Sequence, residues 1–76
     1  MNKERRKALN KISDSLSGLQ KELEVILKDE EGYRDNMPYN LYRSAKYNRA
    51  NEAISCIDSA ADFVNKAVDY ILDAAE

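Results

Sequence analysis

The sequence contains no histidine and only one cysteine, one proline and two glycines in 76 residues. Without histidine, the chain lacks the side chain most used for acid–base catalysis and for binding zinc. A single cysteine excludes an intrachain disulfide framework. We therefore expect a protein without enzymatic activity, metal or other cofactor. Because glycine and proline are the residues that interrupt helices, we also expect long, uninterrupted helices in one small domain.

Neither sign of charge dominates, with 12 basic and 14 acidic side chains and a net charge of −2. Such a balance creates no overall field that attracts nucleic acid or anionic lipid. No stretch approaches the roughly 18 consecutive apolar residues of a membrane helix, so we expect no membrane contact. No apolar core or small-residue cleavage site follows the basic residues near the start. We therefore expect no signal peptide and a location in the cytoplasm.

Apolar residues spaced alternately three and four apart predict a first helix from about residue 3 to about residue 31. This alternation is typical of a coiled-coil seam, and Leu27 widens the seam by one flank. Gly32 is the expected stop of the helix. The predicted seam comprises Leu9, Ile12, Leu16, Leu19, Leu23 and Ile26, followed by Glu30 and Tyr33.

The same spacing predicts a second helix from about residue 44 to about residue 75. Its predicted seam comprises Tyr47, Ala50, Ile54, Ile57, Ala61, Val64, Val68, Ile71 and Ala75. Two more rows recur every seven residues beside the seam: an alanine row (Ala53, Ala60, Ala67, Ala74) and an aromatic row (Cys56, Phe63, Tyr70). With these rows the apolar arc spans roughly 160°, about twice what the first helix can cover. The second helix therefore has two faces to bury.

The predicted connection, residues 32–43, contains the only proline and much of the tyrosine. Asp35 and Asn36 followed by Pro38 are typical of a turn, and Asn40 or Ser44 can cap the second helix. The connection is longer than the two to eight residues usual in helical bundles. Its Tyr, Met and Leu content indicates that it packs over the end of the hairpin.

The distribution of charge predicts how the helices pair. Residues 1–21 carry a net charge of +4 and residues 22–31 a net −4, whereas residues 32–49 carry +3 and residues 50–76 carry −5. An antiparallel hairpin sets the first block beside the last and the second beside the third. The basic start of the first helix and the acidic end of the second both oppose the helix dipole, so pairing across the hairpin explains them better than intrinsic helicity.

The predicted fold is all-α, an antiparallel coiled-coil-like hairpin that dimerises into a four-helix bundle. A domain of this length buries only about 60% of its unfolded surface, and no disulfide or metal is expected to stabilise it. The aromatic and alanine rows are covered either by the rest of the chain or by a partner, most simply a second copy. We favour the second copy, because small residues let another helix approach closely while aromatic rings fill the gaps. The candidate interface residues are Cys56, Ala60, Phe63, Ala67 and Tyr70, with Tyr33, Met37, Tyr39 and Tyr42 of the connection as a second patch or as a structural plug.

Two charged clusters suggest other functions. An acidic face on the outer side of the second helix could imitate a nucleic-acid backbone and so inhibit a nuclease or another nucleic-acid-binding protein. A basic patch near the start could contact phosphates, although no aromatic platform accompanies it, and we favour a solvated helix start paired with Asp69, Asp73 and Glu76. The acidic face comprises Asp58, Asp62, Asp69 and Asp73, and the basic patch comprises Arg5, Arg6 and Lys7.

One sequence pattern is distinctive: the turn Asp35-Asn-Met-Pro-Tyr-Asn-Leu41. It is preceded by the basic start of residues 2–8 and followed by Ser44 and Tyr47. It resembles that of short helical-hairpin proteins of Gram-positive bacteria and their phages or prophages, over nearly the whole chain. Tyr39 and Ala45 stand where acidic residues are common in that pattern, and the second helix is richer in Ala, Phe and Tyr. The resemblance implies a bacterial mobile-element setting and no particular activity. Together these features favour a small protein–protein interaction module whose partner is itself or a host or phage protein.

Overall fold

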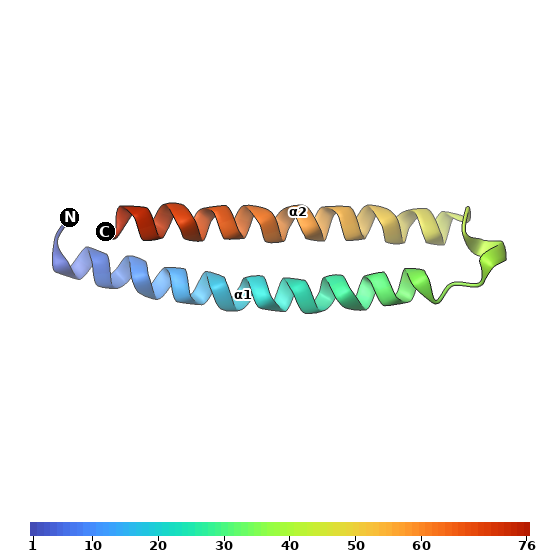
Figure 1. Cartoon of the computed structure of the whole chain (residues 1–76), viewed down its shortest axis with the longest axis horizontal. Helices are drawn as coiled ribbons and strands as arrows, with labels where there is room; N and C mark the ends of the chain where they lie inside the picture. The colour runs from blue at the N-terminus through green and yellow to red at the C-terminus, as the bar shows by residue number, and fades with distance from the viewer.

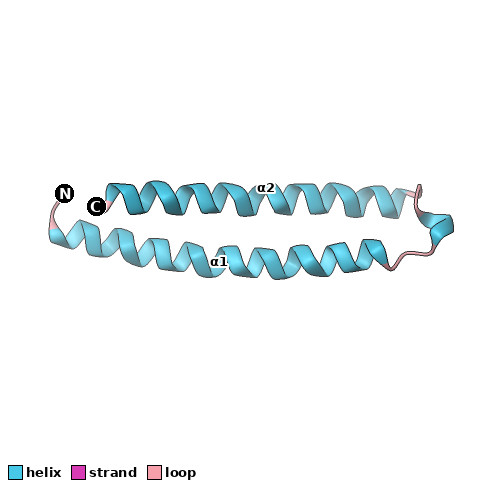
Figure 2. Cartoon of the chain, in the orientation of Figure 1, coloured by secondary structure: helices cyan, strands magenta, loops and turns pink.

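The computed structural model describes all 76 residues as two long helices joined by a short connection. Helix α1 spans Lys3–Asp35, a 3₁₀ turn η1 spans Tyr39–Leu41, and helix α2 spans Ala45–Ala74. The helices run side by side in opposite directions, so that both chain ends lie at the same end of the hairpin (Figure 1). There is no β-strand (Figure 2). The predicted all-α antiparallel hairpin is therefore confirmed for the single chain.

Side-chain caps begin both helices. The Oδ1 atom of Asn2 accepts a hydrogen bond of 2.8 Å from the backbone N–H of Arg5, and the Oγ atom of Ser44 accepts one of 3.2 Å from Tyr47. Each cap satisfies one of the four N–H groups that a helix start leaves without an intrahelical partner. Of the two caps expected for the second helix, Ser44 is the one used.

The predicted stop at Gly32 is wrong, because α1 continues to Asp35 with Asn36 as its C-cap. Gly32 lies in ordinary helical geometry, and no residue in the chain has a positive φ. The stop is set instead by Pro38, since the ring of a proline disfavours helical geometry at the preceding residue, here Met37. The connection is correspondingly shorter than predicted.

The seam of α2 lies where the sequence predicts it, because every residue of that seam is buried or half-buried in the hairpin. Only half of the predicted α1 seam is correct. Leu9, Leu16, Leu23 and Glu30 face α2, but the positions that alternate with them are Ser13, Gln20, Leu27 and Arg34. The predicted positions Ile12, Leu19, Ile26 and Tyr33 are about half exposed. Helix α1 is therefore rotated by about 50° from the predicted orientation, half the angle between successive residues.

Small residues explain this rotation. Of the five buried residues, four are small: Ser13, Ala50, Ala61 and Ala75. Small side chains at the line of contact let two helices approach closely, which leaves little depth for a row of Ile and Leu between them. The larger seam residues, such as Leu16 and Val64, lie half-buried on either side of that line. The hairpin is thus closed by small residues and flanked by larger ones.

The connection packs against the end of the hairpin, as its composition predicts. Met37 is buried. The rings of Tyr42 and Tyr47 are stacked with centroids 5.0 Å apart, and Tyr39 lies 5.4 Å from Tyr42 in a tilted arrangement. This chain of three rings ties the connection to the first turn of α2, because such pairs contribute about 0.5–1.5 kcal/mol each beyond their burial.

The predicted pairing of opposite charges across the hairpin is not made by direct contacts. The one ion pair within 4.0 Å joins neighbouring residues, Arg34 and Asp35, at 3.0 Å. That hydrogen bond raises the pKa of Arg34 above its ordinary value. Between the helices, the one side-chain hydrogen bond runs 3.1 Å from Arg34 to Asn51. The basic start of α1 therefore lies beside the acidic end of α2 at longer range, where the attraction is weak and screened by salt.

Replacement of either glycine by alanine is expected to stabilise the chain. Gly18 and Gly32 both lie within α1, and a Cβ atom built at either position meets nothing within 4 Å. Alanine in a helix interior is about 1 kcal/mol more favourable than glycine. We therefore expect Gly18→Ala and Gly32→Ala each to raise the free energy of unfolding by up to about 1 kcal/mol in urea denaturation followed by circular dichroism. An unchanged or lower stability for both variants contradicts the helical conformation of α1 at these positions.

Removal of the α2 cap is expected to have the opposite effect. The variant Ser44→Ala loses the hydrogen bond to the N–H of Tyr47, at a cost of about 1 kcal/mol. The same urea denaturation measures it, and Asn48→Ala, at an exposed position one turn into the helix, is the matched control. Equal stability of Ser44→Ala and the control contradicts a capping role for Ser44.

Candidate functional site

A row of four large side chains on α1 is exposed in the single chain. Their exposed fractions lie between 49% and 54%, although the sequence predicts them inside the hairpin. We call this set the exposed α1 row. It comprises Ile12, Leu19, Ile26 and Tyr33.

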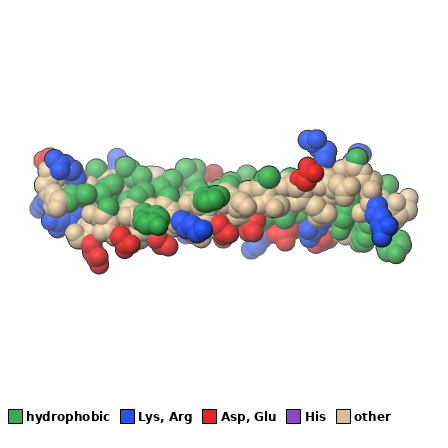
Figure 3. Space-filling model, turned by 90° about the horizontal axis from the view of Figure 1, so that it is seen from above, with side chains coloured by type: hydrophobic (Ala, Val, Ile, Leu, Met, Phe, Trp, Pro, Cys, Tyr) green, Lys and Arg blue, Asp and Glu red, His purple; other side chains and the backbone are tan.

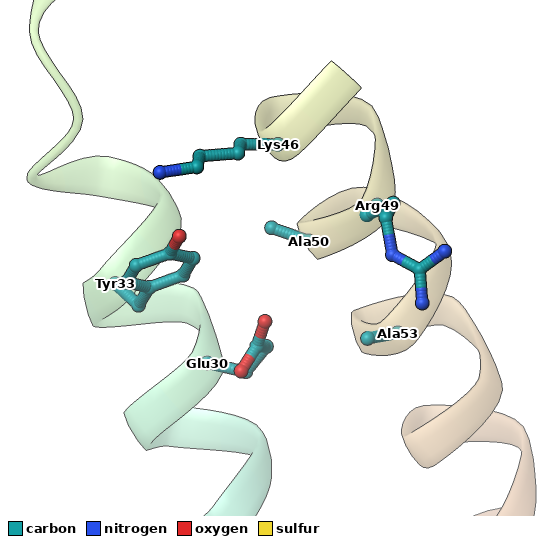
Figure 4. Close-up of a pocket in the computed structure, with 6 residues that line it drawn as sticks. All are labelled: Glu30, Tyr33, Lys46, Arg49, Ala50 and Ala53. Carbon is teal, nitrogen blue, oxygen red and sulfur yellow. The ribbon is translucent and has the colours of Figure 1, made fainter. Parts of the chain in front are cut away.

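The exposed α1 row and the alanine row of α2 lie on the same broad face of the hairpin. Each row stands three residues beyond a seam position of its own helix, such as Leu9 for Ile12 and Ala50 for Ala53. In an antiparallel pair, the residues three positions after a seam residue lie on the same side of the pair in both helices. At the connection end of the hairpin this arrangement is directly visible as a groove (Figure 4). The groove has a volume of about 310 Å³ and is lined by Glu30 and Tyr33 of α1 and by Lys46, Arg49, Ala50 and Ala53 of α2.

The register of the groove places the remaining residues of the two rows. Tyr33 and Ala53 line it together. Because the helices are antiparallel, a step of seven residues back on α1 corresponds to a step of seven forward on α2. These steps bring Ile26 level with Ala60, Leu19 with Ala67, and Ile12 with Ala74. Along nearly the whole hairpin, a large side chain of α1 therefore lies beside an alanine of α2 on this face.

The aromatic row continues this face toward the outer side of α2. Phe63 and Tyr70 are 68% and 76% exposed, and Cys56 is an exposed free thiol. The Nζ atom of Lys66 lies 5.5 Å from the centroid of the Phe63 ring, where its charge interacts with one face of that ring. We call the exposed α1 row, the alanine row and the aromatic row together the apolar face.

The apolar face is one-sided. In a view onto the α2 side, hydrophobic side chains gather along one long edge in the half of the hairpin that carries the chain ends, and acidic side chains lie mainly along the other edge (Figure 3). The rows of the opposite broad face are largely polar. They comprise Asn10, Ser17, Glu24 and Glu31 on α1 and Asn51, Asp58, Asn65 and Leu72 on α2.

The four residues of the predicted acidic face are all exposed, and none lies in an ion pair. Asp58, Asp62 and Asp69 lie on the side of α2 turned away from the apolar face, while Asp73 lies on its outermost line. No group of three or more Cys, Asp and Glu side chains is close enough together to hold a metal ion. The acidic face is thus a solvated strip along about half of α2.

The predicted basic patch lies in the exposed first turns of α1. Its three side chains do not converge, because the guanidinium of Arg6 donates hydrogen bonds of 2.8 and 3.3 Å back to the carbonyl oxygen of Met1. Arg5 and Lys7 are exposed and lie in no ion pair within 4.0 Å. No aromatic side chain accompanies them in this part of α1.

The structure separates the four predicted interface residues of the connection. Tyr33 belongs to the apolar face, and Tyr39 and Tyr42 lie on the exposed tip of the hairpin, with Tyr39 87% exposed. Met37 is buried, so of the two alternatives for this residue the structure supports the structural plug over the interface patch. The tip therefore offers a small tyrosine surface of its own.

Sequence reasoning missed Ile12, Leu19 and Ile26 as surface residues because the rule of alternating apolar positions assigns them to the seam. A signal for the observed orientation of α1 was present in a second possible seam. In that seam, Leu9, Leu16 and Leu23 are each followed by another seam position four residues later. Of these, only Leu27 is apolar, whereas Ser13 and Gln20 are polar. The small size of Ser13 matters more for close helix packing than its polarity.

Neither helix has a segment long and apolar enough to cross a membrane. Comparison with known proteins finds no matching family model, no matching curated protein and no matching solved structure.

Proposed function

We propose that the chain is a small, non-enzymatic protein–protein interaction module that binds through its apolar face and associates with itself into a four-helix bundle. The single observation that carries this proposal is the one-sided exposure of the apolar face. Monomeric proteins rarely leave a contiguous apolar surface of this length open to water, and such surfaces commonly bind a partner. The resemblance of the turn sequence adds a bacterial or phage setting to the proposal.

The architecture supports the same function. Stable domains are built from at least two packed layers of secondary structure, whereas this hairpin is a single layer of 59 × 14 × 12 Å. Only five residues are buried, and no large side chain is fully buried. A partner that covers the apolar face supplies the missing second layer.

The first test compares two acidic substitutions on α1 by light scattering over a range of concentrations. Leu19 lies in the apolar face, while Val25 is 60% exposed on the outermost side of α1. We expect the unmodified chain and Val25→Asp to have twice the mass of the single chain, because Val25 faces solvent in the bundle. We expect Leu19→Asp to be monomeric at the same concentrations, since it places a charge at the centre of the interface.

The same pair of variants decides whether the face also binds another protein. A variant pair on α2, Phe63→Asp with Leu72→Asp as its control on the opposite broad face, repeats the comparison. Self-association and partner capture that survive both Leu19→Asp and Phe63→Asp contradict the assignment of the apolar face. Circular dichroism of each variant shows whether the hairpin itself remains helical.

A second candidate function is inhibition of a nucleic-acid-binding protein through the acidic face. The observation that favours it is that Asp58, Asp62, Asp69 and Asp73 are exposed and free of ion pairs, so their charge is available to a basic groove. Binding to such a groove is expected to weaken steeply as salt rises. Salt-insensitive binding, or binding unchanged by Asp62→Asn with Asp69→Asn, counts against this candidate. Nucleic-acid binding through Arg5, Arg6 and Lys7 gains no support from the geometry of that patch.

A further inference from the structure

We infer that the second copy packs face to face on the apolar face with both connections at the same end of the bundle, so that the exposed α1 row of each copy meets the alanine row of the other. This inference rests on the self-association proposed above and adds which surfaces meet. It makes α1 and α2 equal contributors to the interface.

The exposed surface of the single chain is large enough to require such a partner. A compact monomer of 8.7 kDa has an accessible surface of about 4,700 Å², whereas this hairpin exposes 6032 Å². A standard stable interface removes about 800 Å² from each partner. One broad face of the hairpin, 59 Å long and 14 Å wide, has about that area in projection. A second hairpin has the matching length and width.

The sizes of the side chains on the face favour the arrangement with the connections at the same end. In that arrangement α1 of one copy lies over α2 of the other at the same level. Ile26 then faces Ala60, Leu19 faces Ala67, and Ile12 faces Ala74 of the second copy. Each contact joins one large and one small side chain, so all four helices pack at similar distances.

The alternative arrangement, with the connections at opposite ends, combines the rows less well. It sets the exposed α1 row against itself and the alanine row against itself. Two rows of large side chains hold the α1 helices apart, while two rows of alanine bring the α2 helices together, so the two layers cannot pack evenly along both seams.

Charge supports the same choice at one position. The blocks of net charge do not alternate cleanly in either arrangement, because the register sets the acidic residues 22–31 of α1 beside residues 55–64 of α2, which carry Asp58 and Asp62. Glu22 does select between the two arrangements, because it lies on the rim of the face near the middle of the hairpin. With the connections at opposite ends, Glu22 lies close to Glu22 of the second copy, and like charges repel. With the connections at the same end, it lies beside the aromatic row of the second copy, where Lys66 supplies the opposite charge.

Cysteine cross-linking between two different chains tests the arrangement. In a background that carries Cys56→Ser, one chain receives Leu19→Cys and the other receives Ala67→Cys. These positions are exposed or half-exposed in the hairpin, so the fold is not at stake. A disulfide requires Cα atoms closer than about 7 Å, which the same-end arrangement provides between the two copies. The matched control pairs Leu19→Cys with Ala53→Cys, which lies two heptads, or about 21 Å, further along α2.

We expect the mixed Leu19→Cys and Ala67→Cys chains to form the heterodimeric disulfide at least tenfold faster than the control pair under mild oxidation, as measured by mass spectrometry. A third variant, Ala60→Cys, is expected to form no disulfide with itself, because the two α2 helices lie diagonally across the bundle. Rapid self-cross-linking of Ala60→Cys with a slow Leu19–Ala67 pair overturns the same-end arrangement and leaves the proposed self-association standing. A monomeric mass together with no cross-link in any pair overturns both.

Discussion

The close approach of two helices through small side chains is the constraint on which the rest of this structure depends. Ser13 on α1, Ala50 and Ala61 on α2 and Ala75 at the C-cap of α2 are buried along the line of contact, while no large residue of either helix is fully buried. Packing of this kind brings the backbones near each other but removes little apolar area from water. It therefore contributes little hydrophobic stabilisation, which amounts to roughly 25 cal/mol for each Å² buried. The larger apolar side chains are consequently left on the flanks, where a second layer is needed to cover them.

The flank that carries these side chains determines how the protein can bind. Because the helices are antiparallel, the exposed α1 row and the two apolar rows of α2 lie on one broad face, and polar residues occupy the other. A bundle with both connections at one end also brings together two copies of the exposed tip. Tyr39 and Tyr42 of each copy are then neighbours, stiffened by the stack onto Tyr47. The proposed bundle would therefore have a buried face that holds it together and a separate tyrosine-rich end that stays exposed.

The sequence predicts the hairpin, the antiparallel pairing and the α2 seam, because all three depend on strong periodic signals. It misplaces the end of α1, since Gly32 is compatible with a helix and only Pro38 excludes one. It also assigns Leu19 and its row to the wrong side of α1. The predicted and the observed α1 seams share half of their positions, and the observed one contains the polar residues Ser13 and Gln20. Hydrophobic spacing cannot identify such a seam, because which one is buried depends on how closely the partner helix approaches. The candidate interface is therefore recognised on α2 from the sequence and on α1 only from the structure.

The most direct measurement of this account is a set of nuclear Overhauser effects between methyl groups in a sample that mixes isotope-labelled and unlabelled chains. The proposed bundle predicts contacts between the methyl groups of Leu19 in one copy and Ala67 in the other, and contacts within one chain between Leu27 and the α2 seam. Contacts of Leu19 with Val64 or Val68 of its own chain, without any signal between copies, contradict it. That result would place the exposed α1 row inside the hairpin and leave no second layer to be supplied.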